Sequence, residues 1–267
     1  MPATKLTTKR VQKPWGRTDL GPWFPDATPQ EGKIGEIWFE AEGDPQLLIK
    51  FLFTSQKLSV QVHPDDADAR AAGYERGKDE AWVVLGVRPG STMGIGLTHK
   101  VSPQELRAAA LDGSIEQLID WRPVHANDVF YSPAGTIHAI GAGVTVIEAQ
   151  QNVDLTYRLY DYGSARELHL DAAMKVSRPE PFTRVEHPRD LGDGRRLVSS
   201  GPKFDMERWQ GEGTCTTTAP QTWITLARGT ARLDGEQAGA GETWIALPQT
   251  KIDRSADSDV IAVTPNP

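Results

Sequence analysis

The 267-residue chain is poor in cysteine and in long apolar runs, and each shortage excludes a class of protein. A single cysteine, Cys215, cannot form a disulfide within the chain, which is typical of a reducing compartment. No segment approaches membrane-spanning length, and the first ten residues contain no apolar run typical of a signal peptide. We therefore expect a cytoplasmic protein that does not insert into a membrane.

Excess positive charge is also missing. The chain has 36 acidic residues against 29 basic ones, a net charge of -7 at pH 7 and an isoelectric point near 5.4. A nucleic-acid surface draws on clustered Lys and Arg, and the sequence has no such cluster. We therefore expect no nucleic-acid partner, and an anionic substrate would need a local basic pocket.

Short β-type runs separated by turn residues dominate the chain. Turn signals such as Pro89-Gly90 and Asn127-Asp128 separate these runs. Many short strands at regular spacing indicate a mainly β protein of the barrel or jelly-roll type. The expected strands cover residues 35–39, 46–53, 58–63, 81–85, 129–132, 144–150 and 155–160.

Two segments interrupt this pattern with helical signals. Ser102 and Glu105 form a capping box around Pro103, and apolar residues follow at roughly helical intervals. We expect one or two helices over residues 103–120, with a break near Gly113, so that a helical insertion occupies about residues 102–121. A further helix is expected over residues 170–176.

A polar, proline-bearing stretch, residues 177–190, is interpreted as a linker between two β units. The first unit covers residues 1–176 and the second covers residues 191–267. A weak internal repeat supports this division, because the β-type segments on the two sides of the linker resemble each other. The second copy has no histidine after Pro248, so we expect the second unit to bind no metal.

The segment that starts at Leu58 and reads LSVQVHPDD alternates apolar and ligand-type side chains. Read as a strand, it places Leu58, Val60 and Val62 on a packing face and Gln61 and His63 on the opposite face. The second face is therefore suited to hold a metal ion.

Glu80 and His138 add a carboxylate and a second imidazole to the set that Gln61 and His63 begin. Zinc accepts such N and O ligands in a roughly four-coordinate shell and keeps a position open when it is catalytic. Two histidines and one carboxylate also describe the facial triad of non-haem iron enzymes. The donor set alone leaves both metals open.

These motifs, together with residues 13–16 (KPWG) and 148–162 (EAQQNVDLTYRLYDY), resemble the type I mannose-6-phosphate isomerases. That family consists of zinc-dependent enzymes of the cupin fold. The resemblance runs from Lys13 to about Tyr162 and weakens beyond. It implies a bicupin with a small helical insertion in the first barrel and a metal-free second barrel.

The resemblance also implies a role for each matching residue. The ligands of one zinc ion per chain would be Gln61, His63, Glu80 and His138. The catalytic groups would be Arg158, Glu148 and Lys78. The groups around the substrate would be Ser59, Lys50 and Lys78.

The chemistry of an aldose–ketose interconversion suits these residue types. A proton moves between C1 and C2 through an enediol, and zinc and Arg158 would stabilise the oxyanion that develops. Glu148 is the preferred base, Lys78 is a competing base or proton shuttle, and Asp154 is a weaker candidate. Lys50 interrupts an apolar run, which predicts that it faces solvent or a polar pocket for phosphate or sugar hydroxyls.

We therefore expect a zinc-dependent isomerase of D-mannose 6-phosphate and D-fructose 6-phosphate, acting as a monomer or weak homodimer on a small phosphorylated sugar. Two alternatives stay open. One is an iron-dependent cupin oxygenase that uses His63, Glu80 and His138 as its triad. The other is a non-catalytic cupin that binds a sugar.

Overall fold

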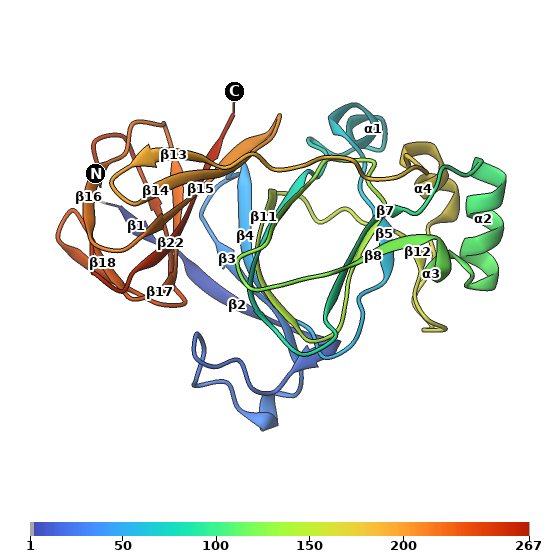
Figure 1. The fold of residues 1–267 in the computed structure, drawn as a ribbon, viewed down its shortest axis with the longest axis horizontal. Coiled ribbons are helices and arrows are strands. Elements are labelled where there is room, and N and C mark those ends of the chain that lie inside the picture. Colours follow the sequence, from blue (N-terminus) through green and yellow to red (C-terminus); the bar gives the residue numbers. More distant parts are fainter. Residues whose placement is uncertain (1–2, 267) are drawn as a thin grey trace.

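Four antiparallel sheets build the molecule in a computed structural model, which describes residues 3–266. The ribbon shows two β units side by side, with helices α2 (Pro103–Asp112) and α4 (Leu170–Val176) at the far end of the first unit (Figure 1). The mainly β fold predicted from the sequence is confirmed. Among the described residues, none of the helices is both long and apolar enough to cross a bilayer.

The first unit contains a six-stranded and a five-stranded sheet. The six-stranded sheet has the order β2 (Thr7–Arg17), β3 (Ile34–Glu40), β4 (Leu47–Phe53), β11 (Val144–Gln151), β6 (Glu80–Val87) and β9 (Val129–Ser132). The five-stranded sheet has the order β12 (Tyr157–Tyr160), β5 (Val60–Val62), β10 (His138–Ile140), β7 (Thr92–Leu97) and β8 (Ile119–Pro123).

Each of the seven expected strands overlaps a strand of this unit, but the strand expected over residues 58–63 is shorter than predicted. It reduces to β5, and Leu58 lies before it. Val60 and Val62 pack under the helices, whereas Leu58 belongs to the apolar cluster between the two sheets. The period-two prediction is therefore wrong for Leu58, because strand alternation does not extend to it.

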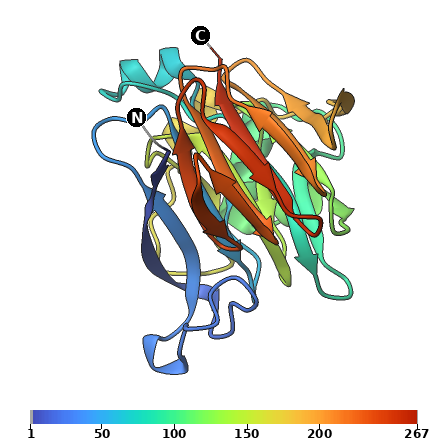
Figure 2. The ribbon, with the colours of Figure 1, turned by 90° about the vertical axis from the view of Figure 1, so that its left-hand side faces the viewer.

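The second unit repeats the two-sheet arrangement (Figure 2). Its seven-stranded sheet has the order β1 (Thr4–Lys5), β20 (Thr243–Ala246), β17 (Thr222–Arg228), β22 (Asp259–Pro265), β15 (Phe204–Gln210), β14 (Arg195–Ser200) and β13 (Arg189–Gly192). Its four-stranded sheet has the order β16 (Gly213–Thr216), β21 (Lys251–Arg254), β18 (Thr230–Leu233) and β19 (Glu236–Gly239).

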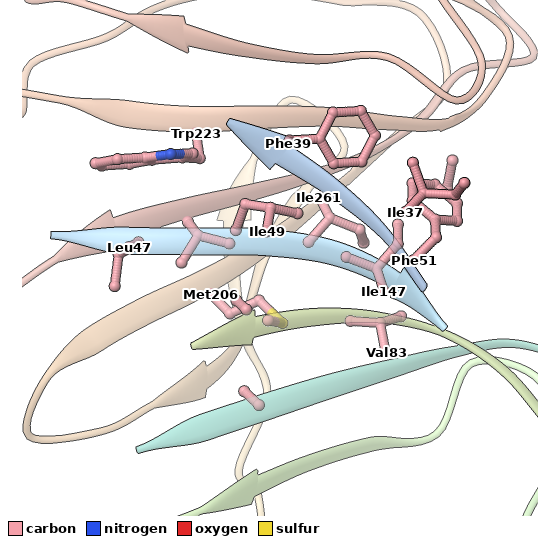
Figure 3. Packing of buried hydrophobic residues seen from close by; sticks show 14 of the residues in the cluster. Ile37, Phe39, Leu47, Ile49, Phe51, Val83, Ile147, Met206, Trp223 and Ile261 are labelled. Carbon is pink, nitrogen blue, oxygen red and sulfur yellow. The ribbon is translucent and has the colours of Figure 1, made fainter. Parts of the chain in front are cut away.

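The two units share one hydrophobic core, which lies between the six-stranded and the seven-stranded sheet (Figure 3). Strand β4 shows the cause: its alternate residues Leu47, Ile49, Phe51 and Phe53 all belong to this core. Trp223 is one of the side chains that the second unit contributes. Burying a large apolar side chain stabilises a fold by about 1.5–3 kcal/mol, so this interface contributes strongly to stability.

Helices α2 (Pro103–Asp112) and α3 (Ile115–Leu118) form the predicted insertion. Both bonds of the capping box at Ser102 are present, and Gly113 ends α2 with a φ of 84°. A helix extending to residue 120 is wrong, because the chain enters β8 at Ile119.

Three further short helices complete the fold. Helix α4 (Leu170–Val176) has the predicted bounds, and α1 (Asp66–Ala71) lies between His63 and Glu80 in the sequence. A 3-10 helix, η1, covers Pro29–Glu31. Residues of α2 and α4 share an apolar cluster with Val60 and Val62, so these helices cover the outer face of the five-stranded sheet.

The stretch interpreted as a linker, residues 177–190, is bonded to the first unit. The N–H of Leu97 donates to Glu180 O, and the N–H of Val101 donates to Pro179 O. Phe182 packs against the apolar cluster between the two sheets of the first unit. Strand β13 then begins at Arg189. The division of the chain into two units at this stretch stays a prediction.

Candidate metal centre and active-site cavity

Three strand ends bring His63, Glu80 and His138 together between the two sheets of the first unit. His63 follows β5, Glu80 opens β6 and His138 opens β10. His63 Nε2 lies 3.3 Å from Glu80 Oε1, and His138 Nε2 lies 3.2 Å from Glu80 Oε2. One ligand atom from each residue lies within 4.8 Å of the others, and all three side chains are buried.

The hydrogen bonds of the two imidazoles fix which nitrogen can bind a metal. His63 Nδ1 donates to Leu155 O and His138 Nδ1 donates to Thr136 O, each at 2.9 Å, because a carbonyl can only accept. The lone pair of each ring is then on Nε2, which faces Glu80. Backbone bonds of this kind orient metal-binding histidines in many proteins.

A cation fits this arrangement. His63 Nε2 and Glu80 Oε2 are buried without a hydrogen-bond partner, and two lone pairs beside a carboxylate repel one another. Burial lowers the pKa of His63 to about 3 in spite of the nearby Glu80, so the ring is neutral at pH 7. Neutral imidazole nitrogens and carboxylate oxygens are ligands that zinc accepts.

Gln61, the fourth residue of the predicted ligand set, lies beside these three side chains. It is paired across the sheet with both His138 and Arg158, because β5 runs between β10 and β12. Its amide Nε2 is 3.3 Å from His138 Nε2. Oxygen and nitrogen of a side-chain amide exchange places by a half-turn, so Gln61 can present either atom to the centre.

A single row of side chains crosses the inner face of the six-stranded sheet next to the metal centre. Strand register aligns Trp38, Lys50, Glu148 and Trp82 on neighbouring strands. Trp82 Nε1 donates to Glu148 Oε2 at 2.8 Å, and Lys50 Nζ lies 3.3 Å from Glu148 Oε1. Burial and the charge of Glu80 raise the pKa of Glu148, although Lys50 opposes them.

Lys50 was predicted to contact the substrate, and in the structure its ammonium also contacts several protein groups. Its ammonium donates to Gln150 Oε1 at 2.6 Å and lies 4.7 Å from the centre of the Trp38 ring. A second carboxylate, Glu36, lies 4.0 Å away. Lys50 therefore sits between two acidic groups, Glu148 and Glu36.

Lys78 is a buried cation beside the metal centre. Its Nζ lies 2.9 Å from Glu80 Oε1. Burial alone would lower the pKa of Lys78, but the charges of Glu80 and Glu148 outweigh burial and raise it. The pKa of Glu80 is well below its usual value, because its neighbours, among them the Lys78 ammonium, outweigh the effect of burial. The pair is therefore ionised at neutral pH.

A cavity of about 280 Å³ is lined by Gln61, Lys78, Glu80, Lys50 and Glu148, among other residues. Arg158 stands at its wall, and its Nη1 donates to Glu167 O at 2.7 Å. Arg166 also lines the cavity and forms a two-bond ion pair with Asp161. Six Lys and Arg side chains and four carboxylates meet here, which makes the cavity locally basic in an acidic protein.

Several site residues predicted from the sequence line this cavity, but others that line it were not predicted. Ser59 and Asp154 line the cavity, and so do the predicted basic groups Lys50, Lys78 and Arg158. Glu36, Lys13 and Arg166 were not predicted. Alternation along β3 from Trp38 would have found Glu36, because residues two apart share a strand face.

Known proteins with related sequences are mannose-6-phosphate isomerases, although no family model matches the chain. Mannose-6-phosphate isomerase ManA of Bacillus subtilis is 40% identical over 213 residues, 73% of this chain and 67% of that protein. The enzyme of Streptococcus mutans is 37% identical over 198 residues, 70% of this chain and 62% of that protein. The match thus spans less than two thirds of the Streptococcus relative.

Solved structures agree over nearly the whole chain. The mannose 6-phosphate isomerase from Bacillus subtilis superposes with a TM-score of 0.85 at 26% identity, covering 98% of this chain and 99% of that one. A putative mannosephosphate isomerase from Archaeoglobus fulgidus has a TM-score of 0.78 at 17% identity, which supports the fold alone.

Two β units with a buried His–Glu–His set in the first define a bicupin with a candidate metal centre. The sequence relatives narrow this class further. The chain belongs to the type I mannose-6-phosphate isomerase family, as its motifs predicted.

Proposed function

We propose that the protein interconverts D-mannose 6-phosphate and D-fructose 6-phosphate with one zinc ion held by His63, Glu80, His138 and Gln61. The observation that carries this proposal is the buried set of two imidazoles and one carboxylate, of which the carboxylate of Glu80 lines a basic cavity. Membership of the family supports the choice of substrate.

Zinc, when bound, would supply a Lewis acid that stabilises negative charge on the sugar oxygens. The protein's own groups would do the rest. Glu148 takes the proton from C2 of the aldose, and the electron pair of that C–H bond forms the C1–C2 double bond while the carbonyl electrons move to O1. A proton then passes from O2 to O1, the carbonyl forms at C2, and Glu148 returns its proton to C1. A raised pKa suits this role, because a base is most efficient when its pKa is near the working pH.

The remaining groups position and stabilise. Trp82 and Lys50 hold the Glu148 carboxylate from two sides. Arg158 contributes a permanent positive charge to the oxyanion of the enediol, since a guanidinium stays protonated in proteins. Lys78, charged beside Glu80, adds to this stabilisation. Lys50 and Ser59 are the groups we assign to the sugar hydroxyls or the phosphate.

A coupled assay with fructose 6-phosphate tests the proposal. Zinc-loaded protein should form mannose 6-phosphate, lose this activity on exhaustive chelation and regain it when zinc is returned. Binding of the sugar phosphate without turnover would favour the non-catalytic sugar-binding cupin. Oxygen consumption by iron-loaded protein, with no isomerisation, would favour the oxygenase.

A further inference from the structure

Lys78 and Glu80 reach the cavity from one buried segment that leads into β6. The N–H of Gly77 donates to Asp66 Oδ1 at 2.8 Å. The side-chain amide of Gln151 donates to the same oxygen at 3.0 Å. The carboxylate of Asp66 therefore anchors the start of this segment through the hydrogen bond from Gly77.

Asp79 provides a second attachment. It lies between Lys78 and Glu80 in the sequence but, unlike these two residues, does not line the cavity. Its carboxylate accepts hydrogen bonds from Tyr131 Oη at 2.8 Å and from the N–H of Ala134 at 2.9 Å. Ala134 lies in the loop that leads to β10, so Asp79 joins the segments that carry two of the candidate ligands.

Both attachments end on one turn of the second unit, residues 201–203 between β14 and β15. Lys203 Nζ lies 2.5 Å from Asp66 Oδ2, and the backbone N–H of Lys203 donates to Tyr131 Oη at 3.3 Å. A Cβ added to Gly201 would lie 1.9 Å from the Tyr131 ring, so the turn packs directly on that ring. The second unit thus contacts both Asp66 and Tyr131, the two side chains that bond to the segment carrying Lys78 and Glu80.

The charges make the Lys203 contact more than a surface ion pair. Partial burial would raise the pKa of Asp66, but bonds from Lys203, Gly77 and Gln151 outweigh it and lower the pKa to about 2. The Asp66 carboxylate is only 23% exposed. Without Lys203, only two neutral donors, the N–H of Gly77 and the side-chain amide of Gln151, would bond to the charged Asp66 carboxylate.

We propose that Lys203 is a positioning residue for the metal centre, so that the second β unit sets the place of Glu80 and Lys78 through Asp66 and Tyr131. The inference rests on the metal site of the proposed function and not on its reaction. It assigns the second unit a part in metal binding, although that unit contributes no ligand. Partners behind the ligands commonly change metal affinity by about 10- to 100-fold when they are removed.

The test is zinc affinity, measured at 25 °C by competition with a chromophoric chelator. Lys203→Met, which keeps the apolar stem, should weaken zinc binding by about tenfold. Lys203→Arg should retain most of the affinity, because it restores a cation. The matched control is Lys251→Met, which removes a different Lys–Asp ion pair of the second unit and should bind zinc like the wild type.

Tyr131→Phe tests the other attachment, because it removes only the hydroxyl and keeps the ring against Phe204. It should also weaken zinc binding. A purely structural role would lower the melting temperature of the metal-free protein and leave zinc affinity unchanged. Wild-type affinity in both Lys203→Met and Tyr131→Phe overturns the inference and leaves the proposed function standing. If the wild type itself binds no zinc, both the inference and the proposed metal site fail.

Discussion

The two β units have the same layered plan, but their interiors differ. Between the sheets of the first unit lie charged side chains, with Glu80, Glu148 and Lys50 all buried next to two imidazoles. The corresponding space of the second unit is filled by an apolar cluster that includes Leu226, Leu233 and Ile252. The same scaffold can therefore be a site or a packing unit, and the inward-facing residues decide which.

The difference has an energetic side. Apolar interiors stabilise a fold directly, whereas buried charges cost free energy unless they are paired. The first unit satisfies this condition with mutually bonded groups, such as Lys50 between Glu148 and Gln150. Its apolar contribution comes from the core that it shares with the second unit and from two apolar clusters of its own.

The largest expected effect comes from changing one charged group of the first interior. Glu148→Gln keeps the shape of the side chain and removes the base, so kcat should fall by about 10²- to 10⁴-fold while zinc content stays unchanged. Leu226→Met, in the apolar interior of the second unit, is the control, and it should leave kcat unaltered. Near-normal turnover of Glu148→Gln would remove this residue from the mechanism and shift the role to Lys78 or Asp154.

The next effect concerns the core between the units. Phe51→Ala should reduce the free energy of unfolding by about 3–5 kcal/mol, because it empties a fully buried site. Both units should still unfold in one transition in urea, followed by tryptophan fluorescence and far-UV circular dichroism. Leu111→Ala, at a side chain that is 65% exposed, should change stability by less than about 0.5 kcal/mol. Two separate transitions would contradict a shared core.

The smallest effect is a dependence on acid at the contact between Lys203 and Asp66. The folded pKa of Asp66, about 2, is below its ordinary value of 3.8. The stabilisation is therefore fully present above about pH 4 and is lost as the pH falls toward 2. The melting temperature of the wild type should exceed that of Lys203→Met by about 1–3 °C at pH 5, and the two should converge near pH 2. A difference in melting temperature that stays constant from pH 5 to pH 2 would show that the stabilisation does not come from the charge of Asp66.

Much of the first unit could be read from the sequence, because its signals are local. Alternation identified the face that carries Gln61 and His63, and the capping box at Ser102 located the start of α2. The position of Lys50 within an apolar run was also informative. Both neighbours of this lysine face away from it, so the pattern predicts that Lys50 faces solvent or a polar pocket, and in the structure it lines the cavity.

Other features are contacts with partners far away in the chain, and a local pattern does not show such a contact even where it gives the strand face, as it does for Glu36. Glu36 acquires its role only because β3 and β4 bring it near Lys50. Lys203 meets Asp66 across 137 positions of sequence. The change from α3 to β8 at Ile119 was missed because an apolar residue with helical spacing can also open a buried strand.

Strand β1 has a consequence for synthesis. Thr4 and Lys5 pair with Ile245 and Trp244 of β20, so β1 joins the seven-stranded sheet through a partner about 240 positions later in the chain. On the ribosome, β1 must wait until that partner has been made. At about 5–20 residues per second the delay is of order ten seconds or more, a period in which an unpaired edge invites wrong partners. Its brevity, only two residues, keeps that hazard small.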